Sequence, residues 1–516
     1  MTRAALAAVT GVALIAACGP SSRATAPTPP APATTVLEPA AGPGPTTAPP
    51  TPVPPAPALD WTKAGIDWSK APPAWEQAAF TPPVPVRFTL KNGVTVYLIE
   101  NHRLPLVSVR MVHGAAGSRG DGARAGLAAL TADLLDEGAE LLELLGQLER
   151  AARAGARLAL GAAGDGVTLR LDTLAETLEP SLAIAADVIL RPRLAPADFA
   201  RVKAERVADL ELRVDSPRAI AALVFERVVF GQHPYGSPGA GWVDTVGALT
   251  LDDVRGFWKA SYGPKATTII VSGDVTRAQL EPILTRQLGG WKSPVTLPRR
   301  PKAATAAAPV LAVVDMPGRP QSVVTIGRLG PDAADPARAA NDVVNTAVGG
   351  SFASRLNTRL REQLGYTYGI GSQFWRAQWG GAWSASSSIR TDVTGAAIRE
   401  ALAILAATQT EPLPADELAR TKALITRALP QEFETNASIA AAFAGLVLEQ
   451  RPMIFWRDRT ATIDAVTAAA AKAAAARAWN ELSIVVVGDW AKIGKDLEAL
   501  GLPIVRYDVQ GRPQQP

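Results

Sequence analysis

The stretch IIVSGD at residues 269–274 returns as IVVVGD at residues 484–489, 215 positions later. Two other stretches repeat in the same order: PLVSV at 105–109 corresponds to PQSVV at 320–324, and PADFARVKA at 196–204 returns as PADELARTKA at 414–423. Three matches in one order and at nearly one offset indicate that the chain contains an internal duplication, the feature that a sequence search should establish first.

Each copy mixes strand and helix patterns. In the first copy, Lys91-Asn92-Gly93 separates two apolar alternations, at 87–90 and 94–99, which is a strong hairpin signal. Helical periodicity then covers 126–137, 141–154, 176–190 and 196–213 without a regular alternation of strand and helix. The sequence therefore predicts an α+β fold of two homologous domains, each a mixed or antiparallel sheet with helices packed on one face.

Domain boundaries follow from the repeat and from composition shifts. We expect an N-terminal domain at 84–294, a linker at 295–309 that is rich in Pro, Lys, Arg and Ala, and a C-terminal domain at 310–510. A lead-in segment at 60–83 precedes the first domain, and a short tail at 511–516 follows the second.

The amino terminus has the pattern of a targeting signal. A basic start and an apolar run over 1–17 predict a signal peptide that is too short to span a membrane, and small residues precede Cys18 as in a bacterial lipobox. Residues 19–59 hold 14 prolines in 41 positions, so 18–59 is predicted to be an extended tether. Lipidation of Cys18 predicts an envelope lipoprotein, and Gly19 favours the outer membrane facing the periplasm. An ordinary secreted protein with an incidental cysteine is the alternative.

Charge and composition exclude some classes of partner and site. The 52 basic and 48 acidic residues are spread along the chain, without the basic block that a nucleic-acid surface needs, so no nucleic-acid partner is expected. One cysteine and three histidines, His102, His113 and His233, severely restrict any site built from these ligands, because none of the histidines lies three to five residues from another.

Several local motifs resemble one peptidase family. They are GSR at 117–119, GLAALTADLLDEG at 126–138, HPYG at 233–236 and GGSFASRL at 349–356. Together they resemble the pitrilysin/insulinase family of zinc peptidases, the inverzincins, over about residues 84–510. The resemblance implies two pitrilysin-like domains that form half of a clamshell.

The motif that carries zinc in that family is degenerate here. In the family, a helix holds His-x-x-Glu-His, so that two histidines on one helical face bind zinc and the glutamate acts as general base. Here the corresponding positions read Ala129, Leu130, Thr131, Ala132 and Asp133, and Asp209 stands at best where the third ligand is expected. We therefore expect no metal and no catalytic residue in this chain. An Asp133 and Asp209 pair holding a hard cation is an alternative, and an arginine-paired or solvated surface is another.

A segment of the second half, residues 359–368, resembles the one from which an Arg and a Tyr side chain project toward the substrate in the family. The resemblance implies an Arg and a Tyr seven residues apart, and both Arg359 with Tyr366 and Arg361 with Tyr368 satisfy that spacing. Such donors suit a carbonyl oxygen that gains charge. The alternative is an exposed helical Arg and a half-buried strand Tyr.

Three tryptophans follow that segment. Trp375, Trp379 and Trp383 could line an apolar substrate chamber, but packing of the sheet is the favoured interpretation.

Three hypotheses of function follow. In the first, the chain is the non-catalytic subunit of a heteromeric peptidase: it shapes a chamber for a peptide or unfolded polypeptide and supplies Arg and Tyr to a zinc-bearing homologue. In the second, it is a binding or scaffold lipoprotein of the envelope without a role in proteolysis. A third, an enzyme with an unfamiliar metal at Asp133 and Asp209, is less favoured.

Overall fold

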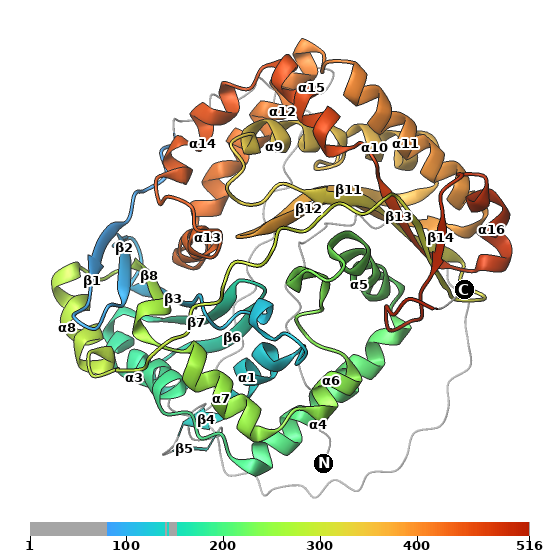
Figure 1. Cartoon of the computed structure of the whole chain (residues 1–516). Coiled ribbons are helices and arrows are strands. Elements are labelled where there is room, and N and C mark those ends of the chain that lie inside the picture. Colours follow the sequence, from blue (N-terminus) through green and yellow to red (C-terminus); the bar gives the residue numbers. More distant parts are fainter. Residues whose placement is uncertain (1–79, 140–141, 144–151, 515–516) are drawn as a thin grey trace, which may run out of the picture. The chain divides into compact units, whose positions relative to one another are not determined.

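Two six-stranded sheets organise the chain (Figure 1). The computed structural model describes residues 80–139, 142–143 and 152–514. The first sheet contains, in order across it, β1 (Val86–Thr89), β2 (Thr95–Glu100), β8 (Thr267–Gly273), β3 (Leu106–His113), β7 (Gly166–Leu174) and β6 (Arg157–Ala163). The second contains β11 (Thr367–Ala377), β12 (Gly380–Arg390), β10 (Gln321–Gly330), β13 (Ser483–Gly488), β9 (Leu311–Asp315) and β14 (Ile504–Arg506). A short pair, β4 (Gly138–Ala139) and β5 (Leu142–Glu143), stands apart. The helix expected at 141–154 is wrong at its start, where β5 lies, and its residues 144–151 lie outside the described residues.

The two sheets share one pairing pattern over five strands. Counted inward from the edge strand β6, three antiparallel pairings are followed by a parallel one. The same series begins at the edge strand β11 of the second sheet. The sixth strands differ, since β1 is antiparallel to β2 and β14 is parallel to β9. This common pattern confirms the α+β fold with two homologous mixed sheets.

Each half supplies a set of helices that cover the faces of the two sheets. In the first half they are α1 (Leu127–Leu135), α3 (Leu178–Leu190), α4 (Pro196–Leu212), α5 (Pro217–Phe230), α6 (Val243–Ala248), α7 (Leu251–Ser261) and α8 (Arg277–Leu288). In the second half they are α9 (Arg338–Val348), α10 (Arg355–Asn357), α11 (Thr394–Thr410), α12 (Ala415–Ala428), α13 (Asn436–Leu448), α14 (Phe455–Asp464), α15 (Ala468–Ala478) and α16 (Trp490–Glu498). Most of them pack on their own sheet in two large apolar cores, but α5 and α13 do not.

Instead, α5 and α13 are exchanged between the halves. Side chains of α5 pack with residues of β9, β10 and β13 on the second sheet, in one shared core. Side chains of α13 pack in the same way with residues of β2, β3 and β8 on the first sheet. Figure 1 shows each helix against the sheet of the other half. Both sheets are therefore covered on both faces, the second face by a helix from the other half.

The repeated stretch explains why both faces must be covered. In the first copy, Ile269 and Val271 enter the core of the first half, whereas Ile270 enters the core shared with α13. In the second copy, Ile484 and Val486 face their own helices while Val485 and Val487 face α5. Strands buried on both faces read as continuous apolar runs rather than as alternations, as these two do.

Polar groups reinforce the contact between the halves at two places. At the first, the Asn436 side chain of α13 donates to the Leu106 carbonyl at 2.9 Å and accepts from Asn101 at 2.7 Å. At the second, Asp165 in the turn between β6 and β7 accepts from the backbone N–H of Gln378 at 2.8 Å and from the Tyr235 hydroxyl at 2.6 Å. The Asp165 carboxylate is buried, so water competes little with these bonds. They join the turn between β6 and β7 to the turn between β11 and β12, to which Gln378 belongs.

Arg119 completes the contact at Asp165. Its guanidinium is buried, pairs with Asp165 and lies 4.2 Å from the centre of the Trp379 ring. The motif at 117–119 and the motif at 233–236, to which Tyr235 belongs, therefore meet at the junction of the halves.

Several sequence predictions fall on residues that the structure does not describe. The signal peptide at 1–17, Cys18, the tether at 18–59 and most of the lead-in at 60–83 lie outside the described residues. At the described end of the lead-in, the Phe80 ring lies 5.7 Å from that of Phe433. Within the described ranges, no helix combines the length and apolar character needed to cross a bilayer.

The exchange of α5 and α13 predicts that the α13 contact stabilises the whole body. Phe443 on α13 is fully buried in the core that α13 shares with the first sheet. Phe443→Ala should lower the free energy of unfolding by about 3–5 kcal/mol, because it leaves a cavity between the halves. Denaturant unfolding followed by circular dichroism measures this. Leu424→Ala, on the exposed face of α12, is the control and should change stability by about 0.5 kcal/mol or less. Equal effects of the two substitutions would contradict the stabilising role given to the α13 contact.

Candidate functional site

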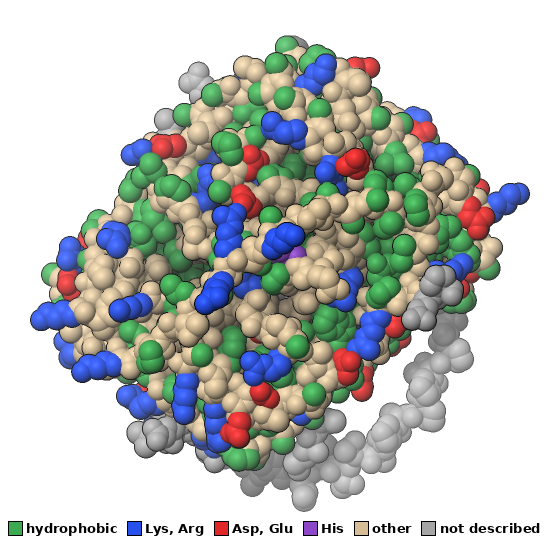
Figure 2. Space-filling model, in the orientation of Figure 1, with side chains coloured by type: hydrophobic (Ala, Val, Ile, Leu, Met, Phe, Trp, Pro, Cys, Tyr) green, Lys and Arg blue, Asp and Glu red, His purple; other side chains and the backbone are tan. Residues whose placement is uncertain are grey.

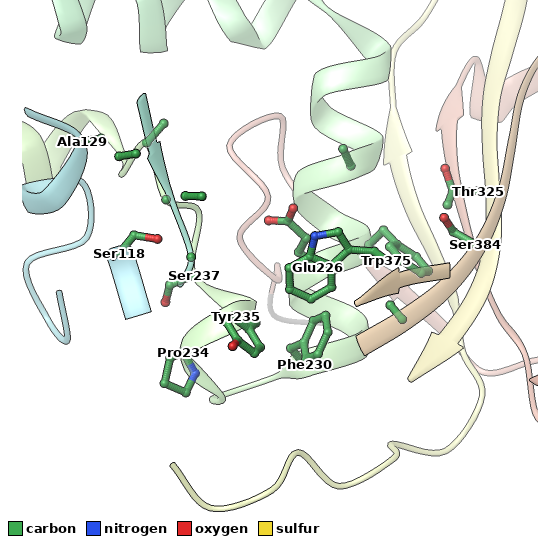
Figure 3. Close-up of a pocket in the computed structure, with 18 of the residues that line it drawn as sticks. Ser118, Ala129, Glu226, Phe230, Pro234, Tyr235, Ser237, Thr325, Trp375 and Ser384 are labelled. Atoms are coloured by element: carbon green, nitrogen blue, oxygen red, sulfur yellow. The ribbon is translucent and has the colours of Figure 1, made fainter. Parts of the chain in front are cut away.

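A cavity of about 490 Å³ lies where the two halves face each other. Its first-half wall comes from α1, α4, α5 and the end of β6, and its second-half wall comes from β10, β11 and β12. Figure 3 shows side chains of both walls, with Ala129 and Ser118 on one side and Trp375, Thr325 and Ser384 on the other.

Helix α1 is held firmly at its start. Gly126 has a φ of 96°, and a Cβ at this position would lie 2.9 Å from the Ala240 carbonyl, so only glycine fits. The Asp121 carboxylate accepts hydrogen bonds from the N–H groups of Gly126 at 3.0 Å and Ala128 at 3.1 Å. Burial raises the pKa of Asp121 to about 7 although these bonds act in the opposite direction. These contacts fix the start of α1, the helix whose residues 129–133 correspond to the zinc motif by family resemblance.

The face that α1 presents to the cavity carries Ala129 and Asp133. Arg206 of α4 donates from Nε to the Asp133 carboxylate at 2.8 Å and makes a second bond through Nη2. Burial raises the pKa of Asp133, and the Arg206 charge opposes this shift. An ion pair between α1 and α4 therefore stands at the positions where the family resemblance implies a metal.

These residues do not fit zinc. Ala129 and Ala132 offer no donor atom, and the Asp133 carboxylate that could coordinate is bonded to a guanidinium. Asp209 acts on Asp133 as a nearby negative charge but does not line the cavity. Among the described residues, no group of three or more His, Cys, Asp and Glu side chains could hold a metal ion. Of the alternatives for Asp133, the structure shows the arginine pair.

The three histidines lie in three different environments. His102 is exposed and bonds to Asp274 through Nδ1 at 2.6 Å. His113 is fully buried beside Thr267, and burial lowers its pKa to about 3. His233 accepts a hydrogen bond from the Tyr235 N–H at 3.2 Å. Each has a structural setting in a loop or strand.

The three tryptophans have three different settings. Trp383 is fully buried against Trp479 and donates to Asn345 at 2.8 Å, as the packing interpretation predicted. Trp379 lies under Arg119 at the junction of the halves. Trp375 lines the cavity with 42% of its surface exposed, so for this residue the chamber interpretation describes its position better.

The arginine and tyrosine segment lies outside the lining of the cavity. It spans a π-helical turn at Thr358–Gln363 and the start of β11. Arg359 pairs with Glu400 at 2.9 Å, and Tyr366 packs against the second core. By contrast, Tyr368 is 89% exposed, and the Arg361 guanidinium lies 4.5 Å from the centre of the exposed Phe352 ring. Arg361 also pairs with Glu362 at 3.1 Å, so both arginines have an acidic partner, and it is Tyr368 that makes the second pair the more accessible one.

Sequence reasoning missed two features of the site. One is the contact at Asp165, for which an isolated aspartate in a Gly-Asp-Gly turn gives no signal. The other is Glu226, which projects from α5 into the cavity (Figure 3). A signal existed for Glu226, because it is the only carboxylate in the apolar helix Pro217–Phe230.

The Glu226 carboxyl has a raised pKa. Its side chain is exposed to the water of the cavity, and partial desolvation by the surrounding walls raises the pKa of the Glu226 carboxyl to about 7. The Arg213 charge acts in the opposite direction and is the weaker effect.

The absence of zinc ligands gives a first test. Protein purified without a histidine tag should contain far less than one zinc per chain after dialysis, measured by inductively coupled plasma mass spectrometry. The physical reason is that Asp133 is already bonded to Arg206 and the neighbouring positions carry alanine. Retention of one zinc per chain would contradict the site described above.

Glu226 gives a second test. Because its pKa is raised in the fold, the ionised carboxylate costs stability, and this cost grows from about pH 4.5 and is complete above about pH 7. Glu226→Gln should therefore stabilise the chain by about 1 kcal/mol at pH 8, a value reduced for solvent screening, and have little effect at pH 4.5. Thermal unfolding at both pH values measures this. An equal change at both, or destabilisation at pH 8, would refute the assignment.

Comparison with known proteins places these features in a family. Residues 248–425 match the peptidase M16 inactive domain. An uncharacterized zinc protease of Streptomyces coelicolor is 33% identical over 182 residues, which are 33% of this chain and 39% of that protein. The match thus spans about two fifths of the relative's length.

Solved structures show the same fold over most of the chain. The peptidase M16 inactive domain from Pseudomonas fluorescens aligns with a TM-score of 0.74 at 24% identity, covering 78% of this chain and 97% of that one. A chain of complex III2 from Candida albicans aligns with a TM-score of 0.68 at 17% identity, covering 80% and 99%. The sequence match, the common fold and the altered helix α1 agree: the chain is a homologue of the pitrilysin, or M16, peptidase family, of the type that lacks the zinc-binding motif.

Proposed function

We propose that this chain is the non-catalytic subunit of a two-chain peptidase. It holds part of an extended peptide in the cavity between its halves and presents Arg361 and Tyr368 to a zinc-bearing homologue. The observation that carries the proposal is the Asp133–Arg206 ion pair on the cavity wall, which stands where the family resemblance implies zinc and leaves a formed chamber without that metal site.

Two sheet edges favour a peptide as the molecule held. Strand β6 pairs with β7 and β11 pairs with β12, and neither has a second strand neighbour among the described residues. Residues at the end of β6 and in the middle of β11 line the cavity. Unpaired backbone groups of edge strands bind extended peptides through main-chain hydrogen bonds, which suits a peptide or an unfolded polypeptide.

The position of the arginine and tyrosine segment favours a second chain. Tyr368 is exposed and outside the cavity, so its hydroxyl is free to reach a neighbouring protein rather than the chain's own α1. A chain of the same fold is a component of complex III2 in Candida albicans, which supports an assembly as the working form. The zinc would belong to the partner.

The proposal keeps the chain at the cell envelope. Acyl chains on Cys18 would anchor it, and the tether at 18–59 would hold the folded body away from the bilayer, with the outer membrane favoured. On the face shown in Figure 2, acidic side chains lie among the basic ones, which agrees with a partner other than nucleic acid.

A reconstitution with a partner tests the proposal. The chain is mixed with a zinc-bearing homologue from the same organism, and complex formation and peptide cleavage are measured. We expect a complex and a gain in cleavage, and we expect Arg361→Ala and Tyr368→Phe each to reduce the gain by about 10- to 100-fold without preventing the complex. Arg420→Ala, an exposed arginine on α12, is the control and should keep the full gain.

Two outcomes would overturn it. No complex and no gain in cleavage would refute the two-chain peptidase. A complex without any gain in cleavage would favour the scaffold alternative, in which the chain has no role in proteolysis. A gain that is insensitive to both substitutions would refute the roles given to Arg361 and Tyr368.

A further inference from the structure

Glu226 stands apart from the other charged groups of the cavity. Asp133 and Arg206 neutralise each other, and Arg218 donates to Ser388 at 3.3 Å. For Glu226, by contrast, no hydrogen bond or ion pair joins it to any residue in the described part of the chain. The Glu226 side chain is exposed in the cavity, and the Arg213 charge acts on it without forming an ion pair. An arriving cation therefore finds a carboxylate that is not already occupied by a salt bridge.

Aromatic side chains surround the place that Glu226 reaches. Trp375 is the cavity-lining aromatic with the largest exposed surface, and its ring lies 5.6 Å from Phe230 and 5.2 Å from Tyr235, nearly perpendicular to both. In Figure 3, Trp375, Phe230 and Tyr235 lie around Glu226 on the same side of the cavity. These contacts fix the orientation of Trp375 while leaving part of the indole open to a ligand.

A carboxylate beside an exposed indole is the pair of groups that recognises an organic cation. The carboxylate supplies the opposite charge and hydrogen-bond acceptors, and the indole supplies a π-face that attracts ammonium and guanidinium groups. The aromatic wall also accepts the apolar stem of a long basic side chain. A free metal ion would find only one ligand here.

We propose that Glu226 and Trp375 form a subsite for the positively charged side chain of a lysine or arginine in the bound peptide. The inference rests on the proposed function, since it names the kind of peptide that the cavity holds. A side chain is favoured over a peptide amino terminus because the edge strands β6 and β11 bind the middle of an extended chain, whose side chains then point into the cavity.

Arg218 confines the preference for a positively charged side chain to one end of the cavity. It precedes Glu226 by eight residues on α5, which is about 12 Å along a helix. The cavity as a whole is therefore balanced in charge, and the preference for a cation is confined to the neighbourhood of Glu226 and Trp375.

Calorimetric titration of the full chain with three peptides tests the inference. The first is a ten-residue peptide of Ala, Ser and Val with one central lysine, acetylated and amidated at its ends. The second carries norleucine, which is similar in length to lysine but uncharged, in its place. The third is the norleucine peptide with a free amino terminus.

We expect the lysine peptide to bind at least tenfold more tightly than the capped norleucine peptide. Glu226→Gln should remove this difference and leave the affinity for norleucine unchanged, and Trp375→Leu should reduce it. Glu434→Gln, an exposed glutamate away from the cavity, should retain the full difference.

The remaining outcomes separate this inference from the proposed function. Equal affinity for the lysine and capped norleucine peptides overturns the subsite while leaving a peptide-holding chamber. Binding of none of the peptides overturns both. Tight binding of the third peptide, lost in Glu226→Gln, would retain the cation subsite and assign it to a peptide amino terminus instead of a side chain.

Discussion

The structure depends on the exchange of α5 and α13 between two copies of one design. Each six-stranded sheet has an apolar face that its own half leaves uncovered, and a helix from the other half covers it. Burial of apolar surface contributes about 25 cal/mol per Å². Removing α5 or α13 from the sheet of the other half would therefore lower the stability of the fold. The two halves are thus held at a fixed separation, and the cavity is what remains between them.

The same exchange positions the chemistry of the cavity. Helix α5 packs on the second sheet and lines the cavity with Glu226, which lies beside Trp375 of β11, with Ala129 of α1 on the other side of the cavity (Figure 3). The Asp133–Arg206 ion pair lines the same cavity, and Asp133 stands at a position to which the family resemblance gives a zinc ligand. In place of a zinc motif, this chain has a salt bridge between α1 and α4 on the wall of a formed cavity. The proposed role, holding a peptide for a zinc-bearing partner, rests on this combination.

The sequence was sufficient for the features that local patterns and the repeat encode. The hairpin at Asn92-Gly93 forms between β1 and β2, and the duplicated stretches form equivalent strands β3 with β10 and β8 with β13. The exchange of α5 and α13 could not be predicted, because the apolar pattern of a helix shows that it is buried but does not specify which sheet it packs against. Nor could the sequence distinguish the roles of Trp375 and Trp383, which follow the same spacing but lie on different strands of the sheet. The partner of Asp133 lies 73 residues away on α4, and only the fold brings the two together.

The central claim is that a peptide is held along the two sheet edges that border the cavity. Hydrogen–deuterium exchange with and without a saturating extended peptide tests this most directly. The account predicts slower amide exchange in β6 and β11, with β1 and β14, the edges at the opposite ends of the two sheets, unchanged. Protection confined to β1 and β14, or to the outer helices, would contradict it.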